Sequence, residues 1–161
     1  MLATSTYYQI LIAIRQRIAD LGLTDIPVTQ LYLRRVPTDR SVDLPAVIIS
    51  PLGTETLLIG TNASEDTGYP VLVTTVQGVT KLPTALASEE NTRDLTLEVQ
   101  ELELTWRETI RFAFHNQRLP GVALVYRCLV EPQPVLDLPL FRDQGLVVSG
   151  LVIRCHTREQ R

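Results

Sequence analysis

The first part of the chain has the three-and-four spacing of apolar residues that is typical of an amphipathic helix. This pattern runs from Tyr7 to Leu21, with charged residues between the apolar positions. A hydroxyl side chain at position 4, 5 or 6 can cap the start of the helix, and Gly22 can end it in the left-handed conformation. We therefore expect an N-terminal helix with one apolar face.

Two later segments have the composition of strands. Leu44–Ser50 contains a β-branched run that predicts a strand buried on both faces, and Tyr69–Gln77 alternates in the manner of a second strand. Glu55–Ile59 is a possible short strand, and Val28–Val36 is ambiguous. Residues 60–68 contain almost nothing that packs in a core, so we expect a solvent-facing connection there.

The longest helical pattern runs from Asn91 to Gln117 and carries two apolar stripes. The thinner stripe contains Leu97 and Leu104, one heptad apart, and Glu103 and Arg107 are expected to form a pair on the helix surface. One stripe is expected to pack on the sheet of its own domain. The other is expected to pack on a neighbouring element or on a neighbouring subunit, and both alternatives remain open.

The C-terminal part predicts two paired strands, Val122–Val130 and Leu146–His156. Alternation along the first strand places Tyr126 and Cys128 on the same face. The order of elements predicts an α+β fold, with a mostly antiparallel sheet of four to five strands flanked by two helices, in a single domain over residues 1–161.

Composition and charge narrow the possible functions. The chain has 161 residues, of which 45% are apolar and 20% charged, as expected for a globular domain. A net charge of −3 argues against a dedicated nucleic-acid binder, which needs a basic surface. Lys81 is the only lysine, and arginine favours fixed ion pairs of the kind found at interfaces. No secretory signal or membrane span is expected, so the protein is expected to remain in the cytosol with reduced thiols.

Candidate catalytic chemistry is sparse. His115 near the end of the long helix is expected to have a capping or solvent role, and His156 is expected to be exposed at the end of the last strand. Cys128 and Cys155 lack the clustered spacing of zinc ligands and are expected to be buried apolar side chains. We therefore predict no enzyme and no catalytic, cofactor-binding or metal site. A small enzyme or ligand-binding domain that uses Cys155 and His156 is the alternative from another class.

Three stretches together resemble a known group of proteins. They are Leu44–Ser50, the polar segment from Gly60 to Asp66, and Gly68–Val73. In these stretches the chain is similar to the tail terminator and tail-completion, or head-to-tail joining, proteins of tailed bacteriophages. The resemblance implies a structural subunit of the virion tail or neck that is assembled in the host cytoplasm. It also implies a homo-oligomeric ring, commonly a hexamer, that caps the tail tube and joins it to the neck or head connector.

The resemblance further implies that DNA passes through the ring without specific binding, and that neither a cofactor nor a membrane is involved. Head-to-tail contacts in a closed ring need complementary surfaces on each subunit. The candidate charged partners are Arg34 and Arg35 on one side and Glu65 and Asp66 on the other, and ordinary surface charge is the alternative for them. The candidate apolar contact is the stripe formed by Leu97 and Leu104. Another neck, sheath-to-tube adaptor or minor tail component is the alternative role.

Overall fold

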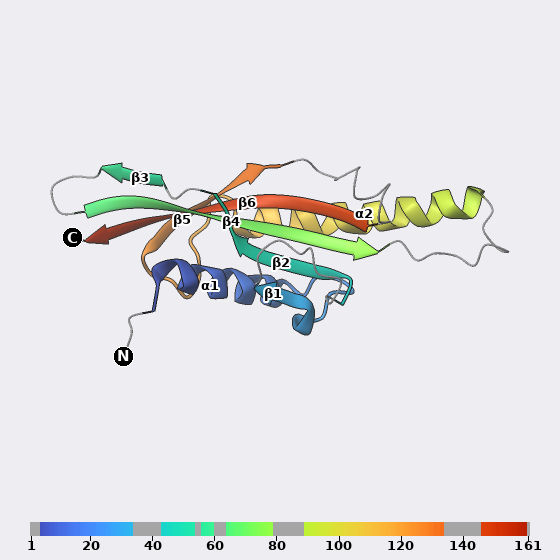
Figure 1. Cartoon of the computed structure of the whole chain (residues 1–161), viewed down its shortest axis with the longest axis horizontal. Coiled ribbons are helices and arrows are strands. Elements are labelled where there is room, and N and C mark those ends of the chain that lie inside the picture. The colour runs from blue at the N-terminus through green and yellow to red at the C-terminus, as the bar shows by residue number, and fades with distance from the viewer. Residues whose placement is uncertain are drawn as a thin grey trace.

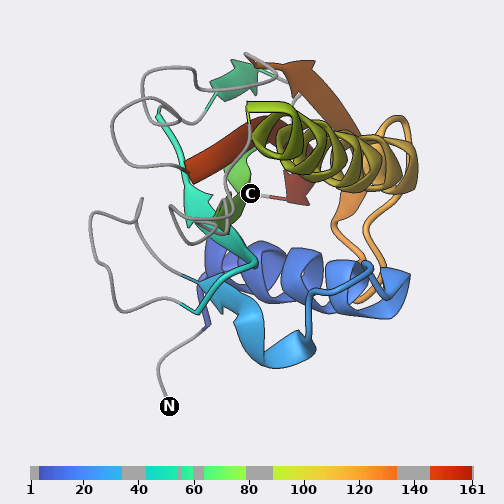
Figure 2. The ribbon, with the colours of Figure 1, turned by 90° about the vertical axis from the view of Figure 1, so that its right-hand side faces the viewer.

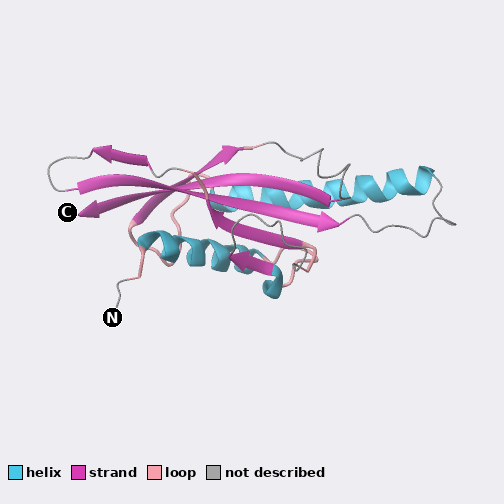
Figure 3. Cartoon of the chain, in the orientation of Figure 1, coloured by secondary structure: helices cyan, strands magenta, loops and turns pink. Residues whose placement is uncertain are grey.

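The computed structural model describes residues 4–33, 43–53, 56–59, 64–78, 89–133 and 146–160. They form an α+β fold in which two helices lie on a mostly antiparallel sheet of six strands (Figures 1 and 3). The elements in chain order are α1 (Thr6–Leu21), the 3₁₀ turn η1 (Val28–Gln30), β1 (Leu31–Leu33), β2 (Ala46–Pro51), β3 (Thr56–Ile59), β4 (Ser64–Gly78), α2 (Glu89–Phe114), β5 (Val125–Pro132) and β6 (Leu146–Gln160).

The sheet has the strand order β1-β2-β4-β6-β5, and β3 pairs with β4. Among the described strands, β1 and β2 pair in parallel, and the other pairs are antiparallel. β6 occupies one edge of β4 along its whole length, while β2 and then β3 occupy the other edge. The long β4–β6 ribbon is therefore the central element of the fold.

The length of this ribbon corrects one expectation. Residues 64–68, expected in a solvent-facing connection, belong to β4 and pair with β6, and residues 65–68 also pair with β3. Thr67 and Gly68 are buried there although neither is a large apolar residue. β6 likewise continues beyond His156 to Gln160. Backbone hydrogen bonds on both edges of β4 hold this polar segment, because a strand does not require apolar side chains when its neighbours supply the ladder.

α1 agrees with its predicted bounds to within one residue. The Ser5 hydroxyl accepts a hydrogen bond from the Tyr8 N–H, and Gly22 adopts φ 59° while its N–H donates to the Ala19 carbonyl. The predicted N-cap and C-cap residue types are therefore confirmed. α2 ends at Phe114, three residues before the predicted end, and His115 follows it in a turn.

The main core lies between the two helices and one face of the sheet. Ile10, Ile14 and Ile18 of α1 and Trp106 and Ile110 of α2 are fully buried against it. Figure 2 shows the two helices lying beside each other on this face. Among the described residues, no helix is long and apolar enough to cross a membrane.

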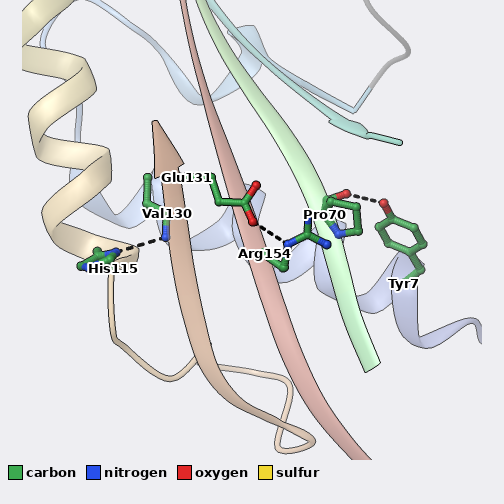
Figure 4. Close-up of polar contacts among 6 residues, drawn as sticks. All are labelled: Tyr7, Pro70, His115, Val130, Glu131 and Arg154. Carbon is green, nitrogen blue, oxygen red and sulfur yellow. Dashed lines mark hydrogen bonds and ion pairs between the residues drawn. The ribbon is translucent and has the colours of Figure 1, made fainter. Parts of the chain in front are cut away.

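Two aromatic side chains anchor the helices through their polar tips. The Tyr7 hydroxyl on α1 donates a hydrogen bond to the Pro70 carbonyl of β4, as Figure 4 shows, and accepts one from the Leu52 N–H at 3.3 Å. The Trp106 Nε1–H of α2 donates to the Thr24 carbonyl at 2.9 Å. Each ring thus buries its apolar body while its polar atom stays paired.

The start of β5 departs from simple alternation. The register shifts between Val125, opposite Thr157, and Arg127, opposite His156, so Tyr126 is an extra residue in the strand. This bulge leaves Tyr126 exposed while Cys128 is fully buried. The prediction that these two residues share a face is therefore wrong. β5 also runs on to Pro132, which is tolerated because β5 is an edge strand.

Candidate interaction surfaces

The predicted interface residues are distributed over several elements. Arg34 and Arg35 lie outside the described residues. Glu65 lies in β4 and Leu97 in α2, but the side chains of both lie outside the described part of the chain. Leu104, on the outer side of α2, is 39% exposed. The thinner apolar stripe of the long helix is thus open to solvent at Leu104.

Asp66 has a different setting from the expected loop. It lies in β4, and its Oδ1 accepts a hydrogen bond from Arg158 Nε of β6 at 3.4 Å. The prediction that it belongs to a solvent-facing loop is wrong, because β4 begins at Ser64. Its ion-pair partner in the structure is within its own chain, and an interface role for Asp66 stays a prediction.

The outward side of α2 forms a row that we call the α2 outer row, made of Glu101, Leu104, Glu108 and Phe112. Leu104, Glu108 and Phe112 follow one another at four-residue spacing and lie on one side of the helix. Phe112 is 72% exposed, and the Arg111 guanidinium lies 5.1 Å from the centre of its ring. Two large apolar side chains with two exposed glutamates therefore cover the outside of α2.

A second group of exposed side chains lies on the sheet face away from the helices, where β5 begins and β6 ends. We call it the strand-end patch, and it consists of Leu124, Tyr126, Arg127 and Arg158. The Arg158 guanidinium lies 5.5 Å from the centre of the Tyr126 ring, and the Arg158 N–H donates to the Leu124 carbonyl at 3.4 Å. This patch combines two exposed apolar side chains with two exposed arginines.

The ionisable groups beside the strand-end patch add little net charge to it. Arg154 Nε of β6 donates to Glu131 Oε1 of β5 at 2.6 Å, and Figure 4 shows this ion pair crossing between the two strands. Burial lowers the pKa of His156, and the nearby positive charges of Arg127 and Arg154 lower it further. The lowered pKa favours the neutral imidazole of His156, although Asp66 and Glu131 act in the opposite direction, and the excess positive charge of the region lies at the exposed arginines.

A buried carboxyl group lies beneath α2, and sequence reasoning placed it wrongly. Glu103 was expected in a surface pair with Arg107, but its exposed fraction is 0%. The Thr75 hydroxyl of β4 donates a hydrogen bond to Glu103 Oε1. Desolvation by burial raises the pKa of Glu103 to about 7, against the lowering effects of Thr75, Ser149 and Arg107.

Arg107 supports the same region by connecting α2 to the sheet. Its Nη1 donates to Ser149 Oγ at 2.8 Å and to the Gly150 carbonyl at 2.5 Å, and its Nη2 donates to the Gln133 carbonyl at 2.9 Å.

The sequence does carry a signal for the buried position of Glu103. It precedes Trp106 and Ile110 by three and seven residues and so belongs to the buried side of the helix.

The cysteines and histidines do not assemble into a reactive group. Cys128 and Cys155 are directly opposed in the β5–β6 register, fully buried, with their Sγ atoms 3.5 Å apart. Cys155 points into the core, whereas His156, the next residue along β6, points to the other face. His115 accepts a hydrogen bond from the Val130 N–H through Nδ1 at 3.2 Å (Figure 4). In the described part of the chain, no group of three or more His, Cys, Asp or Glu residues could hold a metal ion.

Comparison with known proteins gives little further guidance. No protein-family model matches the sequence, and no curated protein matches it. One solved structure similar to this chain is a chain from the virion of a native gene transfer agent particle. Its TM-score is 0.45 at 10% identity, and the match covers 98% of this chain and 100% of that chain. A similarity this weak does not identify a family for the chain.

Proposed function

We propose that this chain is a structural, non-enzymatic subunit of a phage-like particle. Its role is that of a tail terminator that forms a homo-oligomeric ring, commonly a hexamer, on the end of the tail tube. In this role the ring stops tube growth, binds the neck or head connector on its other side and lets DNA pass through its lumen. The residues of the three stretches that resemble tail terminator proteins are the starting point of this proposal.

The observation that carries the proposal is the α2 outer row. Phe112 is 72% exposed on a helix whose inner side is fully buried against the sheet. A solvent-exposed phenylalanine and leucine two turns apart form a patch of the kind that marks protein–protein contacts. A subunit made to bind copies of itself and neighbouring proteins needs such a surface, whereas an isolated enzyme does not.

The chemistry of the buried residues supports a structural role. The two thiols lie in the core, and the histidine next to Cys155 in sequence lies on the opposite face of the sheet. Glu103, the carboxyl group with the raised pKa, is fully buried beneath α2. Among the described residues, these groups supply no nucleophile with an adjacent base.

The charge of the chain supports passage of DNA through a ring. A net charge of −3 for each subunit disfavours tight phosphate binding, because affinity for DNA depends on lysine and arginine contacts that release counterions. DNA moves through a lumen more readily when the side chains that line the lumen bind it weakly. We therefore expect the assembled ring to bind duplex DNA no more tightly than a neutral protein does at physiological salt.

Electron microscopy with tube protein from the same genome tests this function. Purified chain is added to polymerising tube protein, and the ends of the tubes are imaged. We expect rings of this chain at one end of each tube, together with shorter tubes as its concentration rises. Tubes of unchanged length without terminal density would contradict the terminator role. Rings that bind the head connector but never the tube would instead indicate a neck component.

A further inference from the structure

We propose that the α2 outer row of one copy docks on the strand-end patch of the next copy. This inference rests on the proposed function, because it names the two surfaces that would join neighbouring subunits in the ring. It commits to a second copy of this chain as the occupant of both surfaces. The match between the two surfaces in charge and in apolar character is the basis for this choice.

The two surfaces are complementary in composition. The α2 outer row presents Leu104 and Phe112 with two glutamates, which outnumber the one arginine beside Phe112, Arg111. The strand-end patch presents Leu124 and Tyr126 with two arginines, which outnumber the one carboxylate beside Arg158, Asp66. Each surface therefore has apolar area to bury against the other and charges of the opposite sign beside it. Aromatic and arginine side chains are the residue types most often found at the energetic centre of interfaces.

The charges of both surfaces are available to a partner. Only two ion pairs occur among the described residues, Arg154 with Glu131 and Arg158 with Asp66. Glu101, Glu108 and Arg127 take part in neither. Arg158 is 65% exposed, and its contact with Asp66 is long, at 3.4 Å, so a second carboxylate can approach it from outside.

The positions of the two surfaces fit a contact that continues from copy to copy. The α2 outer row faces away from the sheet on the helix-covered side, and the strand-end patch lies on the opposite face of the sheet. Surfaces on different sides of one subunit make head-to-tail contacts, which close into a ring when the rotation is right.

α1 offers a competing apolar row, Tyr8 and Ile12, beside the exposed Arg15. Its charge is also opposite to that of the α2 outer row. However, α1 and α2 lie in the same layer on the same face of the sheet (Figure 2). A contact between two surfaces of one layer pairs two copies face to face and leaves no free surface for a third copy. The α1 row therefore serves as the matched control.

Two charge-reversal variants test the inference. The helix variant carries Glu101→Arg and Glu108→Arg, and the strand variant carries Arg127→Glu and Arg158→Glu. Each variant alone presents two surfaces of the same sign, so we expect its self-association to weaken at least tenfold. In a one-to-one mixture, every helix variant surface meets an oppositely charged surface of the strand variant. We therefore expect the mixture to regain the wild-type oligomer, measured by size-exclusion chromatography with light scattering.

The control variant Ile12→Glu on α1 should assemble like the wild type, and circular dichroism of every variant verifies its fold. Folded variants that assemble normally would overturn the inference, as would a mixture of folded variants that stays dissociated. Loss of assembly in Ile12→Glu together with normal assembly of both charge variants would assign the contact to α1 instead. In each of these cases the wild-type oligomer remains, so the proposed function survives. A wild-type chain that never associates would contradict the proposed function itself.

Discussion

The two helices lie beside each other on the same sheet face but use their inner sides differently. α1 buries an entirely apolar row, Ile10, Ile14 and Ile18, whereas the buried side of α2 includes the carboxyl group of Glu103 beside Trp106. The buried row of α1 therefore contains no titratable group, whereas the stability conferred by α2 also depends on pH. Thus α2, which carries the mostly exposed Phe112 on its outer side, is also the helix that buries a carboxyl group on its inner side.

The greatest loss of folding stability is expected from a change on the inner side of α2. Replacing Trp106 with Ala removes a fully buried ring and its hydrogen bond to the Thr24 carbonyl. We expect a loss of about 3–5 kcal/mol in the free energy of unfolding, measured by urea denaturation. The matched change in α1, Ile14→Ala, should cost about 2–5 kcal/mol at every pH. A Trp106→Ala variant as stable as the wild type would show that α2 does not depend on its inner row.

The two helices also differ in how their contribution to the free energy of unfolding depends on pH. Folding raises the pKa of Glu103 from 4.5 to about 7, so the folded state holds the proton more tightly than the unfolded state. The free energy of unfolding should therefore fall as the pH rises from about 4.5 to about 7, by up to about 3 kcal/mol. Above pH 7 the loss is complete and constant.

Replacing Glu103 with Gln removes this titration while keeping the shape of the side chain. We expect the variant to gain about 1–3 kcal/mol over the wild type at pH 8 and to show little gain at pH 5. Urea denaturation at both pH values, at one protein concentration, measures the difference. An equal difference at both pH values would contradict burial of the ionisable group. Ile14→Ala is the control, since its effect should not change with pH.

A smaller effect is expected at the start of α1. The Ser5 hydroxyl accepts a hydrogen bond from the Tyr8 N–H and caps the helix. Ser5→Ala should cost about 0.5–2 kcal/mol in the free energy of unfolding, and Ser5→Asp should restore most of the loss, because aspartate is also a good N-cap. Equal stability of all three chains in thermal denaturation would show that this cap contributes nothing.

The smallest effect on stability is expected on the outer side of α2. Phe112 is mostly exposed, so Phe112→Ala should change the free energy of unfolding by less than about 0.5 kcal/mol. The same change should nevertheless weaken self-association, because the ring supplies apolar area to the proposed contact. Light scattering on the folded variant measures this. Unchanged assembly would remove Phe112 from the interface.

Periodicity predicted what depends on local side-chain pattern. The bounds of α1, its cap residues and the buried strand β2 follow from spacing and composition within a short window. The pattern also distinguished the stripe containing Leu104 from the stripe that packs on the sheet, and left its partner open between a neighbouring element and a neighbouring subunit. Leu104 is partly exposed. Each of these features is determined by residues close together in the sequence.

The remaining features depend on partners that are distant in the sequence. Residues 65–68 are strand because β3 and β6 pair with both of their edges, which their polar side chains do not indicate. The hydrogen-bond partner of the buried Glu103 is Thr75, 28 residues earlier, which the local helical pattern does not indicate. The bulge at Tyr126 depends on the register with β6. The strand-end patch was missed for the same reason, since it joins residues from β5 and β6 that are neighbours only after folding.

Native mass spectrometry of the wild-type chain over a wide concentration range is the decisive test of whether the chain forms a closed ring. We expect one predominant closed oligomer whose mass is a fixed multiple of that of the chain, with little change in size as concentration rises. A monomer at every concentration would contradict it, as would a ladder of ever longer oligomers that never closes.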